Sequence, residues 1–431
     1  MVWCFTHVAV SSSLQSPVSA SSAARPASVF LLLVPFALAY GASYFFRNVN
    51  AVAGPILARE FALGPADLGL LTSAYFFTFS LAQIPLGMAL DRYGPSRVNA
   101  VMALAGALGA LLFGMAQDVA GLTLGRALIG LGAGAALMSA MSAVHLWVPR
   151  EKVATAIGLI MCVGGAGALA ASTPTQVMID AIGWRHMFLI LAGLTALFAA
   201  GVFATRGQVR PAAHAQTFRE LAGGVVTVFS NGPFWLVCLP MMLILGTMLA
   251  FQSLWAATWM RDVAGYSEKG EIGNVLFALN FGMTLSFLLA GWIGDLFARR
   301  GYSRLAVIKM AFVLALLAQA WLMAAPSFLP HVAWGFFAFA ANSLVPVYAL
   351  LASWFAPALT GRVNTAVNVL CFSMAFVLQW VIGALLARYP SVGGHYAAAG
   401  YYIAWITLLV LQVAAFAWMV YRVRDRAPVH A

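Results

Sequence analysis

The sequence predicts an all-helical integral membrane protein with twelve transmembrane helices in two pseudo-symmetric six-helix bundles. Of the 431 residues, 63% are hydrophobic and only 8% are charged, an apolar excess that a water-soluble core of this size does not need. The apolar runs match the roughly 20 residues of a spanning helix and are too long for barrel strands. One long polar connection, at 205–233, divides the runs six and six.

Charged or polar breaks delimit each run. In order, the twelve runs lie at 29–49, 67–90, 98–117, 120–145, 153–173, 186–204, 234–257, 272–294, 305–325, 331–353, 365–386 and 399–421. The N-terminal bundle is therefore expected at 29–204, the linker at 205–233 and the C-terminal bundle at 234–421. Residues 1–28 lack a basic segment before an apolar core, so a disordered tail is expected rather than a signal peptide. Residues 422–431 are the expected C-terminal tail.

The chain has a net charge of +11, and the positions of its basic residues match the predicted topology. Most Arg and Lys residues lie on the tails or on the connections of the same side, which places both termini in the cytoplasm and the chain in the inner or plasma membrane. This distribution argues against nucleic-acid binding. The four cysteines are singly placed without metal-type spacing, and we interpret them as reduced and structural.

A charged hairpin joins the second and third runs. Its glycines and charges are Gly87, Asp91, Arg92, Gly94 and Arg97. A degenerate copy ends the eighth run at 291–295, with a Gly-Trp-Ile-Gly-Asp sequence that closes on Asp295. Two copies at equivalent places indicate that the two halves are duplicated.

The hairpin resembles the loop between the second and third helices of the major facilitator superfamily. Arg126 with its following glycines in the fourth run, and the Gly183-Trp184-Arg185 turn, are similar to two further motifs of that family. The resemblance implies two halves of inverted triplets and alternating access around a site at mid-membrane. It also implies a conformational role for Gly87, Asp91, Arg92, Gly94, Arg97, Asp295 and Arg126.

In that family Asp91 would latch the outward-open state by facing the positive N-terminal end of the eleventh helix. For Arg126 two alternatives stay open. Either it organises a buried polar network, as the motif implies, or it pairs with Asp118, since intramembrane ions need a partner.

Arg47 is the strongest candidate for substrate contact. The first run continues apolar to Leu57, so Arg47 is expected well inside the helix, and Tyr40, Tyr44 and Arg47 fall on one face. The surrounding stretch is similar to the first helix of the family's organophosphate and organic-anion branch, which implies that Arg47 binds the anionic group. A guanidinium donates two parallel hydrogen bonds to a carboxylate or phosphate. The alternative is an Arg47 that extends to the lipid headgroups.

Further candidates for the site are Tyr75, Gln252, Trp255 and Asn368. For these the alternatives are helix-to-helix hydrogen bonds or, for the tryptophan, a lipid-facing position. The seventh run has no basic residue before Arg261, so a single cavity Arg fits a carboxylate at least as well as a phosphate.

The favoured function is therefore secondary transport of a small organic anion. One alternative is an exporter of neutral or cationic hydrophobic compounds, and another is a receptor of the same fold that does not transport. The sequence has no nucleotide loop, nucleophile elbow or metal-ligand cluster, so no enzyme, cofactor or metal is expected. The expected partners are the substrate, the lipid bilayer and either a coupling ion or a counter-substrate, and we expect a monomer.

Overall fold

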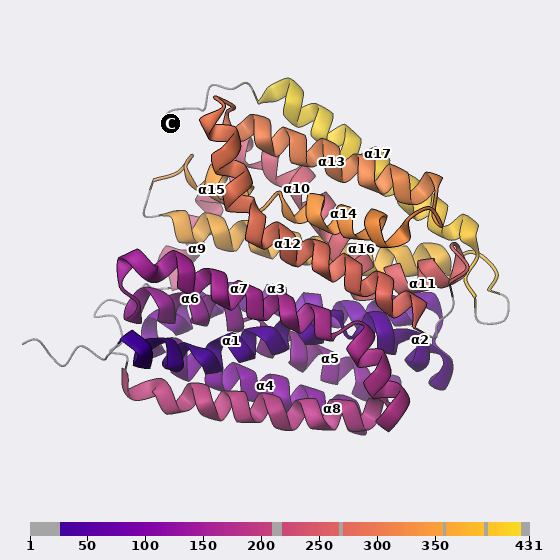
Figure 1. Ribbon diagram of the computed structural model, residues 1–431, viewed down its shortest axis with the longest axis horizontal. Helices are drawn as coiled ribbons and strands as arrows, with labels where there is room; N and C mark the ends of the chain where they lie inside the picture. Colours follow the sequence, from indigo (N-terminus) through magenta and orange to yellow (C-terminus); the bar gives the residue numbers. More distant parts are fainter. Residues whose placement is uncertain (1–25, 209–217, 267–269, 357–358, 392–394, 424–431) are drawn as a thin grey trace, which may run out of the picture.

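The computed structural model describes residues 26–208, 218–266, 270–356, 359–391 and 395–423. Two helical bundles lie side by side, the N-terminal half below and the C-terminal half above in Figure 1. We call the end with the connection 61–64 and residues 387–391 the outer end, and the opposite end, which carries α9, the inner end. The predicted tails, 1–28 and 422–431, lie almost wholly outside the described residues.

The helices of the N-terminal half are α1 (Pro26–Asn48), α2 (Asn50–Glu60), α3 (Pro65–Tyr93), α4 (Pro95–Met115), α5 (Val119–Ala133), α6 (Ala136–Trp147), α7 (Val153–Ala170) and α8 (Thr173–Ala204). After α9 (Phe218–Phe229), the C-terminal half has α10 (Gly232–Ala250), the π-helical segment η3 (Phe251–Trp255), α11 (Ala256–Asp262), α12 (Glu271–Arg299), α13 (Arg304–Ala324), α14 (Pro330–Asn342), α15 (Pro346–Ala352), α16 (Thr360–Leu386) and α17 (Ala398–Arg422).

These helices combine into the predicted all-α membrane architecture. Ten described stretches are long and apolar enough to cross a membrane. The continuous pair α1 and α2 adds a span, and Gly183, with φ 79°, turns the chain inside α8 so that α7 and the first part of α8 form another. The described helices thus agree with the predicted order of twelve.

Five spans are interrupted. The breaks fall at Val49 between α1 and α2, at Gly134–Ala135 between α5 and α6, at 171–172 between α7 and α8, in η3, and at 343–345 between α14 and α15. Apart from the span made of α7 and the start of α8, each broken span is the first of a three-helix unit, which is the pattern of an internally repeated transporter. Such breaks free backbone groups for side chains or ligands, so they point to the place where a site is built.

Glycines let several helices pack backbone to backbone. Gly130 of α5 lies against the carbonyl of Tyr75 in α3, and Gly167 of α7 lies against the carbonyl of Gly41 in α1. A Cβ atom at either glycine would overlap that carbonyl. Small residues at helix contacts allow this close approach in membranes, where dispersion contacts replace the hydrophobic effect.

Gly167→Ala is accordingly expected to destabilise the protein. Two helix backbones would have to separate, and overpacking of this kind costs about 1–3 kcal/mol. We expect the melting temperature of the purified protein to fall by several degrees. The matched control is Gly193→Ala, because a Cβ there meets no atom within 4 Å. Equal melting temperatures for the two variants would contradict the close contact of α1 with α7.

An ion pair ties the outer end of the N-terminal half. Arg185 Nη1 donates to Glu60 Oε1, Trp184 Nε1 donates to Glu60 Oε2 at 2.7 Å, and Arg185 Nη2 donates to the Ala116 carbonyl at 3.3 Å. Partial burial raises the pKa of Glu60, but the hydrogen bonds from Arg185 and Trp184 outweigh it, so the pKa lies below its ordinary value of 4.5.

The lowered pKa of Glu60 predicts that the fold loses stability at acidic pH. A carboxylate with a lowered pKa stabilises the fold above its ordinary pKa, and that stabilisation is lost as the pH falls through the folded-state value. Both side chains are more than a third exposed, so the effect is about 1 kcal/mol or less. Glu60→Gln is expected to lower the melting temperature slightly at pH 7 and to flatten its decline below about pH 4.5. Parallel curves for both proteins would exclude this role.

Candidate functional site

Arg47 lies between the two halves, in the last turn of α1. Its side chain is buried, with the residue 6% exposed. The guanidinium carbon is 4.4 Å from the ring centroid of Tyr44, 5.4 Å from that of Phe79 and 4.9 Å from that of Phe372. The first two rings belong to the N-terminal half and the third to α16, so aromatic faces from both bundles enclose this cation.

The buried charge of Arg47 has no acidic partner among the described residues. None of the ion pairs in that part of the chain includes Arg47, and its Nε is buried without a hydrogen-bond partner. The C-terminal end of α1 and the ring faces offset part of the cost of burying a cation. An anionic ligand would supply the charge complement that the protein does not.

The three tyrosines among the predicted site residues are also buried. The rings of Tyr40 and Tyr44 are 5.1 Å apart edge to face, and the Tyr40 hydroxyl contacts the sulfur of Met161 at 3.6 Å. Tyr75 donates to the Ser43 carbonyl at 3.2 Å. The tyrosines around Arg47 therefore come from α1 and α3, and Tyr40 also contacts α7.

Asn368 takes part in a polar bridge between the halves. Its Nδ2 donates to Gln83 Oε1 of α3 at 3.0 Å, and Tyr348 of α15 donates to its Oδ1 at 3.3 Å. One helical turn away, the hydroxyls of Ser80 and Ser373 are 2.8 Å apart. This bridge lies one turn from Phe79 and Phe372, the rings that contact Arg47.

Gln252 and Trp255 are buried within the π-helical segment η3. Gln252 Nε2 donates to Asn280 Oδ1 at 2.6 Å, and Trp255 Nε1 donates to the Gln379 carbonyl at 3.0 Å. The ring of Trp255 also lies against Gly69 of α3. In this conformation both side chains make contacts that hold helices together toward the outer end.

Arg126 holds the end of α1 at its break. It is fully buried, its Nη1 donates to the Phe46 carbonyl at 2.8 Å, and its guanidinium carbon is 5.3 Å from the Tyr75 ring centroid. The last carbonyls of a helix lack intrahelical partners and carry partial negative charge, so a cation there is stabilised. Asp118 instead accepts from Gly121 N at the start of α5, so the pairing with Arg126 is absent.

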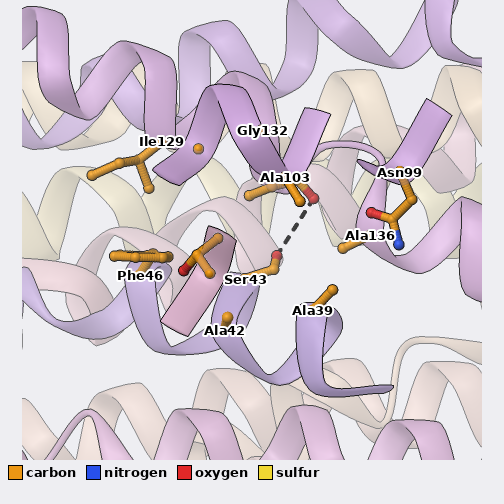
Figure 2. A pocket seen from close by; sticks show the side chains of 12 residues that line it. Ala39, Ala42, Ser43, Phe46, Asn99, Ala103, Ile129, Gly132 and Ala136 are labelled. Atoms are coloured by element: carbon orange, nitrogen blue, oxygen red, sulfur yellow. Dashed lines mark hydrogen bonds between the residues drawn. The ribbon is translucent and has the colours of Figure 1, made fainter. Parts of the chain in front are cut away.

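A small cavity of about 20 Å³ lies inside the N-terminal half (Figure 2). Its lining includes Ser43, which donates to the Ala133 carbonyl, and Asn99, whose amide atoms are buried without a protein partner. This volume admits about one water molecule. It is too small for an organic substrate.

Apart from Arg126, the predicted conformational residues lie at the inner end. Gly94, with φ 78°, turns the chain between α3 and α4. Asp91, Arg92 and Arg97 are exposed, and the side chain of Asp91 makes no hydrogen bond or ion pair with another described residue. A Cβ at Gly87 meets no atom within 4 Å. The Asp91 latch is thus not engaged here, and the side chain of Asp295 is outside the described part.

At the outer end, by contrast, α3 and α16 are in close contact. A Cβ at Gly69 would lie 2.8 Å from the Gln379 carbonyl, and one at Gly383 would overlap the Pro65 carbonyl. The halves therefore meet tightly on the outer side of Arg47. In this conformation the two halves are closed against each other at this end of the molecule.

Comparison with known proteins agrees with this architecture. The model of the Major Facilitator Superfamily matches residues 36–342. The D-galactonate transporter of Escherichia coli O6:H1 is 28% identical over 335 residues, which cover 72% of this chain and 76% of that one. The probable sulfoacetate transporter SauU of Cupriavidus necator is 29% identical over 165 residues, 38% of each chain, so the match spans well under half of that relative.

A solved structure shows the same fold. The crystal structure of a bacterial homologue of the human lysosomal transporter Spinster has a TM-score of 0.73, covering 92% of this chain and 97% of that one at 17% identity. The family match, the transporter relatives and the spanning helices make this a multi-pass membrane transporter of a small molecule, and not an enzyme. The chain belongs to the Major Facilitator Superfamily.

Proposed function

We propose that this protein transports a small organic anion and that Arg47 binds the anionic group. The observation that carries the proposal is the buried Arg47 between the halves, without a carboxylate partner among the described residues. A buried unpaired charge is costly in a membrane and is kept where it serves a substrate or ion. A guanidinium with aromatic faces on several sides is suited to a planar carboxylate or a sulfonate.

The substrate class is a hydroxylated or short-chain carboxylate or sulfonate. The tyrosines near the cation, Tyr40 and Tyr44, offer hydroxyls that match a polyol chain. Relatives named as transporters of D-galactonate and of sulfoacetate are consistent with such a substrate. Among the described residues, no second cation contacts the aromatic rings that surround Arg47. A phosphate ester is therefore less favoured as the substrate.

Transport would follow alternating access, with both termini in the cytoplasm and a monomer as the working unit. The outer ends of α3 and α16 meet in this conformation. In the opposite state, the inner ends would close and Asp91 would face the start of α16. A gradient of protons or sodium, or exchange for a counter-substrate, would supply the energy.

Counterflow in proteoliposomes tests the proposal. Vesicles loaded with unlabelled D-galactonate, D-glucarate, sulfoacetate or a sugar phosphate are diluted into the same labelled compound at trace concentration. Transient accumulation of a carboxylate or sulfonate, absent from empty vesicles and not competed by galactose, is the expected result. Transport of lipophilic cations instead would support an exporter. Saturable binding without accumulation would support a receptor of this fold.

A further inference from the structure

A second cavity lies at the outer end, away from Arg47. Its volume is about 280 Å³, large enough for a small organic molecule. Its walls come from both halves, with Arg59 of α2 and Leu68 of α3 on one side, and Thr258 and Arg261 of α11 with Tyr396 on the other. Among the described residues that line this outer cavity, two are arginines and none is a carboxylate.

Arg261 is held rigidly in this wall. Its Nε and Nη2 donate to Asp262 Oδ1 and Oδ2 at 2.6 and 3.1 Å. Asp262 is fully buried and also accepts from Tyr396 N and the Tyr401 hydroxyl, each at 3.1 Å, while His395 Nδ1 lies 2.9 Å from its Oδ1. Five contacts on one buried carboxylate fix the plane of the guanidinium before any ligand arrives.

Arg59 and Arg261 both make contacts within the protein, and the five N–H donors of a guanidinium leave further positions for an anion. Asp262 lies behind Arg261, within the protein, and Glu60 next to Arg59 is bonded to Arg185 and Trp184. Asp67 in the first turn of α3 is exposed and is not part of the lining. Thr258 and Ser391 add hydroxyls to the lining, and Tyr396 adds a ring, so the cavity combines cations with neutral hydrogen-bonding groups.

We propose that the outer cavity is a second anion-binding site, in which a small carboxylate or sulfonate bridges Arg59 of the N-terminal half and Arg261 of the C-terminal half. An anion shared between cations of the two halves stabilises the outwardly closed state, because it binds that state better than one in which the halves are apart. The site also concentrates the substrate anion at the mouth of the transport route. For its ligand class the proposal rests on the proposed function.

The test reads binding at the outer cavity itself. Ser391 is exposed and lines the cavity. Ser391→Cys, in a background with Cys4, Cys162, Cys238 and Cys371 replaced by serine or alanine, is labelled with an environment-sensitive fluorophore in nanodiscs. Sodium D-galactonate, sulfoacetate and inorganic sulfate are then titrated at constant ionic strength, with galactose as the neutral control.

We expect a saturable response to the anions and none to galactose. Arg59→Gln should raise the half-saturating concentration at least fivefold, Arg59→Lys should retain most of the affinity, and Arg47→Ala should leave it unchanged. The proposal is overturned if Arg59→Gln binds like the parent protein, or if Arg47→Ala abolishes the response. If the proposed function fails but the outer site exists, counterflow is absent for every anion while this response to sulfate remains.

Discussion

Arg47→Ala is expected to reduce anion counterflow at least a hundredfold while leaving the protein folded. Removing one member of a buried charge pair costs about 3–5 kcal/mol, which corresponds to a factor of about 10² to 10³ or more in binding. In the absence of substrate, Arg47 has no acidic partner among the described residues, so the mutation leaves no carboxylate stranded. The loss should therefore appear in substrate binding and transport, and the melting temperature without ligand should stay within a few degrees of the wild-type value.

Arg47→Lys is the matched charge-retaining variant. A lysine keeps the positive charge but loses the planar pair of donors and the stacking on Tyr44 and Phe372. We expect partial transport with a raised KM. In a thermal-shift titration, the anion that is transported should stabilise the wild type by mass action and should not stabilise Arg47→Ala. If Arg47→Ala transports at the wild-type rate, Arg47 is structural and the anion proposal fails.

Much of the architecture was predictable because spanning length and apolar composition act over whole segments. The first run was predicted to continue to Leu57, and α2 indeed reaches Glu60. The break at Val49 was not predicted, since no glycine or proline is at that position. Just before the break, the Phe46 carbonyl accepts a hydrogen bond from Arg126, which lies 80 residues further along the chain. A bond to a backbone carbonyl leaves no side-chain pattern by which sequence analysis could find it.

Sequence spacing could predict which candidate residues lie together only where they belong to one regular helix. Tyr40, Tyr44 and Arg47 share a face because α1 is regular there, and the structure places their side chains together. Around Gln252 and Trp255 the π-helical turn changes the angle between successive residues. The spacing of an α-helix therefore does not tell on which face of the helix these two side chains lie. Asp262 is the last residue of α11, yet its side chain is fully buried and accepts hydrogen bonds from Tyr396 and Tyr401, which lie far along the chain.

Gly383→Val is expected to impair transport by keeping the outer ends of the halves apart. In the present conformation a Cβ at Gly383 would overlap the Pro65 carbonyl and lie 3.2 Å from Ala66 Cα, so valine would fit only if α3 and α16 separate. Overpacking costs about 1–3 kcal/mol, which changes the ratio of closed to open states by a factor of about 5 to 150. The penalty falls on one state alone, so it shifts the population and does not simply destabilise the fold.

Distances across the outer end measure that shift directly. Spin labels at the exposed positions Asp67 and Arg388, after replacement with cysteine in the cysteine-free background, report on the separation of α3 from the end of α16. We expect a longer distance in Gly383→Val than in the parent protein. Gly87→Val is the paired variant, because its Cβ is free in this conformation but lies in the hairpin that the inner closure would bring toward α16.

The two glycine variants should therefore move the equilibrium in opposite directions. Gly87→Val should keep the short outer distance and resist the change that substrate produces, whereas Gly383→Val should show the long distance even without substrate. Both should lose most of their counterflow, since each half-cycle depends on one closure. An unchanged outer distance in Gly383→Val would mean that α3 and α16 absorb the extra methyl groups locally, and that the contact of Gly383 with Pro65 is not what limits closure at the outer end.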